Sequence, residues 1–169
     1  MERFFDIFFS FLSIIFLSPL LIFISLILRF SGEGEILFLQ ERVGRDGKIF
    51  NIFKFATMLK DSPKIGTGTI SVRDDPRVLP VGKILRKTKI NELPQLFNVL
   101  VGDMSIIGPR PLISKSYDLY SLELQQEIKK VKPGLSGIGS IVFRDEEDIL
   151  HGSNASQNFY NNIIAPYKG

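Results

Sequence analysis

Hydrophobic residues are unevenly distributed along the chain, and their longest uninterrupted run is near the N-terminus. No charged residue occurs between Ile7 and Leu28, where Phe, Ile and Leu predominate. At about 1.5 Å per residue, a helix of this length just crosses a hydrocarbon core about 30 Å thick. The run is too long for a cleaved signal peptide and has no small-residue cleavage site, so we expect it to hold the chain in a membrane.

Ser18 and Pro19 lie near the middle of this run and predict a bend in its helix. Proline lacks the amide hydrogen, and its ring crowds the preceding turn. Each limb then has about eleven residues, or roughly 16 Å, which is half of the hydrocarbon thickness. Arg3 and Arg29 flank the run evenly, so charge does not orient it. On these grounds a re-entrant helix, with both arginines in the cytoplasm, and a kinked spanning helix fit equally well.

Two apolar runs of strand length follow a short glycine-rich exit from the membrane segment. They cover residues 36–43 and 48–55 and flank a turn at 44–47 that contains Asp-Gly. Asp-Gly between two such runs predicts a β-hairpin. Residues 60–80 are polar and rich in Gly and Pro, so we expect a long loop there, a kind of segment that is often functional.

Apolar residues recur at helical spacing in the rest of the chain. The predicted helices cover residues 81–87, 91–100 and 116–131. The expected fold class is therefore an α/β membrane-associated protein. Residues 1–32 form its membrane helix, and residues 33–169 form a small domain with a β-hairpin and amphipathic interfacial helices.

The composition narrows the chemistry that the chain can perform. It has no cysteine, which excludes disulfides, thiolate metal sites and cysteine nucleophiles. Its one histidine, His151, lies in a polar segment and is expected to be a solvated loop residue. Catalysis therefore depends on carboxylates, lysines, arginines, hydroxyls or a metal bound through oxygen.

The net charge of +3 is modest, but basic residues cluster in one segment. Lys83, Arg86, Lys87 and Lys89 fall within seven residues, a density that suits phosphates or an anionic membrane surface. A solvated basic face is the alternative interpretation. No recognised nucleic-acid-binding motif accompanies the cluster, so nucleic acid is not expected as a partner.

The segment KINELPQLFNVLVGDMSIIGPRP, residues 89–111, has two interpretations. Pro94 fits the first turn of the predicted helix, which places the helix start near Asn91. In the first interpretation Asn91 is only the N-cap, and Glu92 complements the helix dipole. In the second, the helix start favours a bound phosphate and Glu92 holds a divalent cation or acts as a base. Arg110, in the stiff Gly-Pro-Arg-Pro turn, then binds a phosphate.

Five features occur in a fixed order: the apolar N-terminus with its Ser-Pro pair, FLQERVGRDGKIFNIFKFATM, DDPRVLPVGKILRKT, NELPQLFNVLVGDMSIIGPRPL and VKPGLSGI. In them the chain resembles, over nearly its whole length, bacterial sugar transferases of the small monotopic phosphoglycosyl transferase family. The resemblance implies an enzyme on the cytoplasmic face of the bacterial inner membrane, with a re-entrant helix bent at Ser18-Pro19 and a cytosolic catalytic domain over residues 33–169. Such an enzyme moves a sugar phosphate from a UDP-sugar to a polyprenol (undecaprenyl) phosphate, releases UMP and uses Mg²⁺.

The catalytic pair of that family is Asp-Glu, in which the aspartate attacks the sugar-linked phosphate with the help of Mg²⁺. Glu92 matches the glutamate and is the expected metal ligand, whereas Asn91 stands at the position of the aspartate. An amide is a poor nucleophile and brings no charge to a metal, although it caps a helix as well as an aspartate does. Three explanations stay open: an engineered Asp-to-Asn change that traps substrate, a natural subgroup in which the polyprenol phosphate attacks directly, or an inactive chain.

Further phosphate contacts are expected besides Arg110, namely Arg77, Lys54 and Arg144. Ala56 stands where relatives often have a basic residue, so one phosphate contact is either missing or supplied by Lys54. The competing class is a non-enzymatic membrane protein that binds nucleotide-sugar or polyprenol phosphate or scaffolds an active relative. A single-span protein with a soluble binding domain is the third alternative. Membrane lipid is an expected partner, and an apolar helix this rich in Phe also suits pairing in a homodimer. Relatives usually continue beyond Gly169, so we expect the C-terminus to be truncated.

Overall fold

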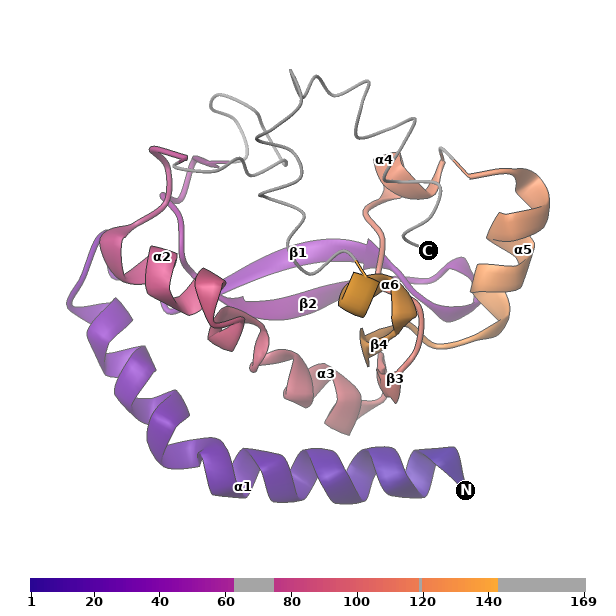
Figure 1. Cartoon of the computed structure of the whole chain (residues 1–169), viewed down its shortest axis with the longest axis horizontal. Helices are drawn as coiled ribbons and strands as arrows, with labels where there is room; N and C mark the ends of the chain where they lie inside the picture. The colour runs from indigo at the N-terminus through magenta and orange to yellow at the C-terminus, as the bar shows by residue number, and fades with distance from the viewer. Residues whose placement is uncertain (63–74, 119, 143–169) are drawn as a thin grey trace.

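A computed structural model describes residues 1–62, 75–118 and 120–142 (Figure 1). The elements in chain order are α1 (Glu2–Arg29), β1 (Leu37–Val43), η1 (Arg45–Gly47), β2 (Ile49–Phe55), α2 (Pro80–Lys87), η3 (Ile90–Glu92), α3 (Gln95–Val101), β3 (Ser105–Ile107), α4 (Ser114–Tyr117), α5 (Leu122–Lys130), β4 (Gly134–Ser136) and α6 (Ile138–Val142). This mixed architecture agrees with the predicted α/β class. Most of the expected loop over residues 60–80, together with His151, lies outside the described residues.

The predicted hairpin is confirmed as β1 and β2, which pair antiparallel with Leu37 opposite Phe55. Its turn contains Asp46 with a φ of 59° and Gly47 with a φ of 75°. Aspartate tolerates this left-handed region better than most residues, and glycine adopts it freely. The Asp-Gly pair therefore accounts for the position of the turn.

Asn98 on α3 fixes this helix to the edge of β2. The side chain is fully buried, its Oδ1 accepts from the backbone N of Phe53 at 2.9 Å, and its Nδ2 donates to the carbonyl of Asn51 at 2.8 Å. Buried backbone groups at a strand edge need partners, and the amide supplies one acceptor and one donor. Asn98 thus sets the position of β2, which carries Lys54, relative to the helix that follows Glu92.

Helix α1 is continuous but bent, and Figure 1 shows two limbs that run in different directions. A proline inside a helix is a common cause of such a bend. Pro19 cannot donate to the carbonyl of Ile15, and the hydroxyl of Ser18 donates to that oxygen instead, at 2.8 Å. The Ser-Pro pair therefore bends the helix without leaving this acceptor unpaired.

The N-terminal limb of α1 docks on α3 and β3 through two charged side chains. Arg3 donates to the carbonyls of Val99 and Leu100 at 2.6 and 2.7 Å. These carbonyls lie near the C-terminal end of α3, where acceptors are left unpaired and the helix dipole favours a cation. Asp6 is buried and accepts from the backbone N of Ile106 at 3.0 Å. The start of α1 is thus fixed to the globular part of the chain.

The C-terminal limb of α1 packs against the same globular part. Its buried side chains form one core cluster with β2 and α2, made up of Leu21, Ile24, Leu28, Phe55 and Leu85. Most other apolar side chains of α1 are exposed, many of them phenylalanines. Among the described helices, α1 alone is long and apolar enough to cross a membrane.

The helix prediction over residues 116–131 is wrong, because the structure has two helices there, α4 and α5. Ser121 begins the second one, and its hydroxyl accepts from the backbone N of Leu124 at 3.3 Å. A serine N-cap starts a new helix. The predicted helix over 81–87 is confirmed as α2, with Pro80 in its first turn.

Candidate active site

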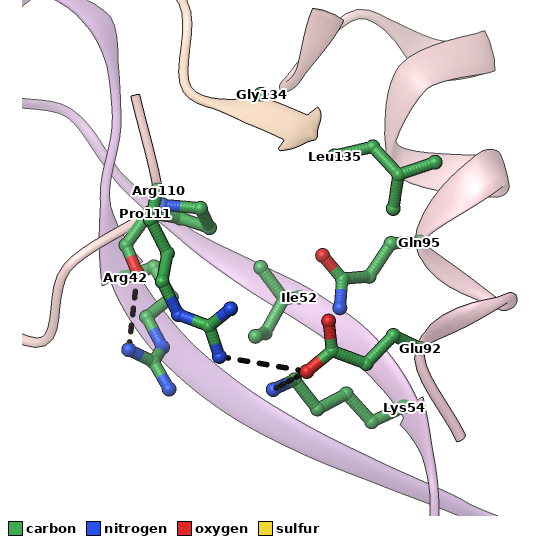
Figure 2. A pocket seen from close by; sticks show the side chains of 9 residues that line it. All are labelled: Arg42, Ile52, Lys54, Glu92, Gln95, Arg110, Pro111, Gly134 and Leu135. Atoms are coloured by element: carbon green, nitrogen blue, oxygen red, sulfur yellow. Dashed lines mark hydrogen bonds and ion pairs between the residues drawn. The ribbon is translucent and has the colours of Figure 1, made fainter. Parts of the chain in front are cut away.

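Side chains from three separate segments meet in one polar pocket (Figure 2). Glu92 comes from the end of η3, Lys54 from β2, and Arg110 from the turn after β3. The other lining residues are Arg42, Ile52, Gln95, Pro111, Gly134 and Leu135. The pocket therefore brings together three of the residues that the sequence analysis selected.

The carboxylate of Glu92 faces two cations through a single oxygen. Its Oε1 lies 3.1 Å from Nζ of Lys54 and 3.5 Å from Nη2 of Arg110. The exposed fractions of the side chains of Lys54, Glu92 and Arg110 are 15%, 22% and 30%. Charges buried to this extent are screened by salt less than surface charges are, so their mutual attraction is strong.

Burial and charge act in opposite directions on these groups. Burial alone would raise the pKa of Glu92, but the positive charges of Lys54 and Arg110 outweigh it and lower that pKa to about 2. Burial lowers the pKa of Lys54 to about 8, although the charge of Glu92 acts to raise it. Glu92 is thus ionised and a weak base at neutral pH, whereas Lys54 loses its proton near pH 8.

Arg42 is a pocket residue that the sequence analysis missed. It lies on β1, and its Nη1 donates to the carbonyl of Pro111 at 3.0 Å, beside Arg110. The hairpin register pairs Arg42 with Phe50 and places it on the same face of the sheet as Lys54, because side chains alternate along a strand. The alternation of side chains along the predicted hairpin could therefore have placed Arg42 on the same face as Lys54.

Arg110 is positioned by a close contact between two glycine-containing segments. The backbone N of Gly108 donates to the carbonyl of Ser136 at 3.0 Å, and that of Gly134 donates to the carbonyl of Pro109 at 2.8 Å. A Cβ on Gly134 would lie 2.1 Å from the backbone N of Gly108, so no side chain fits there. The VKPGLSGI motif thus holds the turn that presents Arg110 to the pocket.

Asn91 does not cap α3, so the interpretation of this residue as the N-cap is wrong. Helix α3 begins at Gln95 with Pro94 as its N-cap, and Asn91 lies in the separate 3₁₀ turn η3. Asn91 is 7% exposed and is not among the residues that line the pocket. Within the described part of the chain, its buried Oδ1 has no hydrogen-bond partner. The side chain of Glu92 therefore lines the pocket, whereas that of Asn91 does not.

Arg77 lies outside the pocket and is 4% exposed. Its Nε and Nη2 donate to the two carboxylate oxygens of Asp75 at 2.8 and 2.6 Å, and its Nη1 donates to the carbonyl of Ser62 at 2.7 Å. These contacts join two parts of the chain and do not direct the guanidinium toward Glu92. The role of Arg77 as a phosphate contact stays a prediction that this packing does not favour. Arg144 lies outside the described residues.

The Mg²⁺ site expected at Glu92 does not fit this arrangement of donors. Mg²⁺ is usually held by one or two carboxylates together with substrate phosphates. No group of three acidic or histidine side chains gathers anywhere in the described ranges. The Oε1 of Glu92 already faces Lys54 and Arg110, and these cations would repel a divalent ion placed beside them. The described residues suit an anion better than a metal ion.

Comparison with known proteins identifies the family. Residues 1–163 match the sequence model of the bacterial sugar transferase family. The chain therefore belongs to this family, as its motifs predict.

Named relatives are similar over most of this chain. It is 34% identical over 159 residues to the exopolysaccharide production protein ExoY of Sinorhizobium fredii, which covers 86% of this chain and 70% of that protein. It is 35% identical over 162 residues to the undecaprenyl-phosphate galactose phosphotransferase of Salmonella typhimurium. It is 39% identical over 154 residues to the UDP-glucose:undecaprenyl-phosphate glucose-1-phosphate transferase of Klebsiella pneumoniae. The latter two alignments cover 88% of this chain but only 34% and 32% of those longer proteins.

Proposed function

We propose that this chain transfers a sugar phosphate from a UDP-sugar to a polyprenol phosphate and releases UMP, at the first membrane-committed step of glycoconjugate assembly. The observation that supports this most is the pocket in which Lys54 and Arg110 lie beside Glu92, with Arg42 among the other lining residues (Figure 2). Both substrates carry phosphates, and the described lining residues have three cations against one carboxylate. Preorganised cations of this kind stabilise phosphate charge in such transfers. Two relatives are named for undecaprenyl phosphate, one with galactose and one with glucose.

In the proposed reaction an oxygen of the polyprenol phosphate forms a bond to the phosphorus that carries the sugar. The bond from this phosphorus to the oxygen that bridges it to UMP breaks, and UMP leaves with that oxygen. We propose direct attack, because Asn91 is a poor nucleophile and is buried away from the lining of the pocket. Lys54 and Arg110 are placed to stabilise the charge on the transferred and leaving oxygens, and Glu92 holds these two cations in position.

We further propose that α1 is re-entrant, entering and leaving the membrane on the cytoplasmic side. Its N-terminal limb is bonded to α3 through Arg3, and its C-terminal limb is packed on β2 and α2 through Leu28. A helix that spans about 30 Å of hydrocarbon has its two ends on opposite sides of the membrane. Two ends docked on one globular body favour the bent, same-side arrangement (Figure 1). The exposed phenylalanines of α1 then lie in lipid.

Release of UMP from a panel of UDP-sugars, with and without undecaprenyl phosphate, tests the proposed reaction. We expect acceptor-dependent release with at least one UDP-sugar, and a fall of about 100-fold in Arg110→Gln, as for other residues that stabilise developing charge. Arg45→Gln is the matched control, because Arg45 is exposed and lies outside the pocket. Absence of UMP release with every UDP-sugar, while UDP still binds, would support the non-enzymatic class instead.

A further inference from the structure

The described residues that line the pocket include three cations, Arg42, Lys54 and Arg110, and one carboxylate, Glu92. We infer that the pocket binds the diphosphate of its nucleotide substrate without a divalent metal ion, with Arg42, Lys54 and Arg110 as the counter-charges. The inference rests on the proposed function, since it assumes a UDP-sugar as the substrate. It concerns this chain in particular, because the amide of Asn91 occupies the position beside Glu92.

Glu92 is already neutralised by protein cations. Both close contacts, to Lys54 at 3.1 Å and to Arg110 at 3.5 Å, involve Oε1. A divalent ion bound by this carboxylate would lie next to two positive charges in a partly buried site, where repulsion is stronger than in water. An anion in the same place is attracted by both cations.

Asn91 does not provide the missing ligand. Its amide oxygen carries no net charge, and the Oδ1 atom is fully buried. Mg²⁺ gives up its bound waters reluctantly and usually keeps several of them. A hydrated ion at the pocket therefore cannot reach this oxygen unless the η3 turn opens.

The three cations have the charge and placement that a diphosphate needs. Arg42 comes from β1, Lys54 from β2 and Arg110 from the turn after β3, so they approach the pocket from different elements (Figure 2). Against the single carboxylate of Glu92, the described lining residues keep an excess of positive charge. Each phosphate of a UDP-sugar carries one negative charge, and these three side chains are placed to attract it where a metal ion would otherwise do so.

Metal binding and nucleotide binding are measured separately to test the inference. Mn²⁺, as a stand-in for Mg²⁺, is titrated into the full chain in detergent and followed by electron paramagnetic resonance, for the unmodified chain and for Glu92→Gln. The affinity for UDP is measured by calorimetry in EDTA and in MgCl₂. Glu92→Gln removes the one carboxylate among the described lining residues, and we expect its Mn²⁺ affinity and that of the unmodified chain to agree within about threefold.

For the unmodified chain we expect UDP affinities in EDTA and MgCl₂ that agree within about threefold. Arg42→Gln should weaken UDP binding in EDTA about tenfold, whereas Arg45→Gln, on the exposed turn, should leave it unchanged. UDP binding that is lost in EDTA and restored by MgCl₂ would overturn the inference but keep the proposed function. Mn²⁺ binding that is at least about tenfold tighter in the unmodified chain than in Glu92→Gln would overturn it as well. If UDP binds neither in EDTA nor in MgCl₂, both the inference and the proposed function are overturned.

Discussion

Oε1 of Glu92 lies 3.1 Å from Nζ of Lys54, although 38 positions separate these residues in the sequence. The contact depends on the position of β2 relative to η3 and α3. Asn98 fixes that position through its two bonds to the backbone of β2. The geometry of the pocket is therefore sensitive to a residue that does not line it.

Asn98→Leu is expected to lower the free energy of unfolding by roughly 2–5 kcal/mol, because it leaves the buried N–H of Phe53 and the carbonyl of Asn51 without partners. Thermal unfolding in detergent, followed by circular dichroism, measures the change. Gln126→Leu, at an exposed position of α5, is the matched control and should leave the midpoint nearly unchanged. Equal midpoints for the two variants would contradict the role of Asn98.

Lys54 should give the reaction a pH dependence. With a pKa of about 8, its side chain is charged below pH 8 and neutral above it. We expect kcat/KM for the UDP-sugar to fall as the pH rises through 8, because a neutral amine no longer attracts the phosphates. In Lys54→Arg the guanidinium stays charged, so the fall should move to higher pH. Identical pH profiles of UMP release for the two chains would show that Lys54 does not control this step.

Glu92→Gln removes the counter-charge of Lys54 and Arg110 and keeps the shape of the side chain. We expect UMP release to fall about 100-fold, because the two cations are no longer held in position. Affinity for UDP should be retained, since the pocket becomes more positive. Glu127→Gln, on the exposed surface of α5, serves as the control. Full turnover in Glu92→Gln would rule out the proposed positioning role.

The re-entrant arrangement of α1 predicts that both of its ends face the cytoplasm. The chain has no cysteine, so single cysteines report without background. We expect Glu2→Cys, at the start of α1, and Glu41→Cys, on β1, to react with a membrane-impermeant maleimide in inverted vesicles and not in intact spheroplasts. Labelling of Glu2→Cys in intact spheroplasts would instead indicate a spanning helix.

Local sequence patterns predicted the parts of the fold that local forces determine. The Asp-Gly turn predicted the β-hairpin, and the helical spacing of apolar residues over 81–87 predicted α2. The pattern over residues 116–131 failed because helical spacing continues across Ser121, where a side-chain cap begins a new helix. Asn91 also resembled an N-cap, because asparagine is common at that position. In the structure it lies in a separate 3₁₀ turn, η3, and α3 begins only at Gln95.

The candidate site was predictable only in part, because it is assembled from distant segments. Glu92, Lys54 and Arg110 were selected as charged residues in recognisable motifs, and the structure brings them together. Charge alone does not indicate whether a side chain is already paired inside the fold. Arg77 is bonded to Asp75 in the interior, whereas Arg42 lines the pocket from β1. Tertiary structure alone decides which of these two arginines reaches the site.

The most direct test of the proposed transfer is to detect its lipid product. The unmodified full chain is incubated with undecaprenyl phosphate and a panel of UDP-sugars, and the lipid fraction is examined by mass spectrometry. The proposed function predicts undecaprenyl diphosphate-linked sugar, formed in equal amount to UMP, and a loss of about 100-fold in Arg110→Gln. Formation of UMP and free sugar phosphate without any lipid-linked sugar would contradict it.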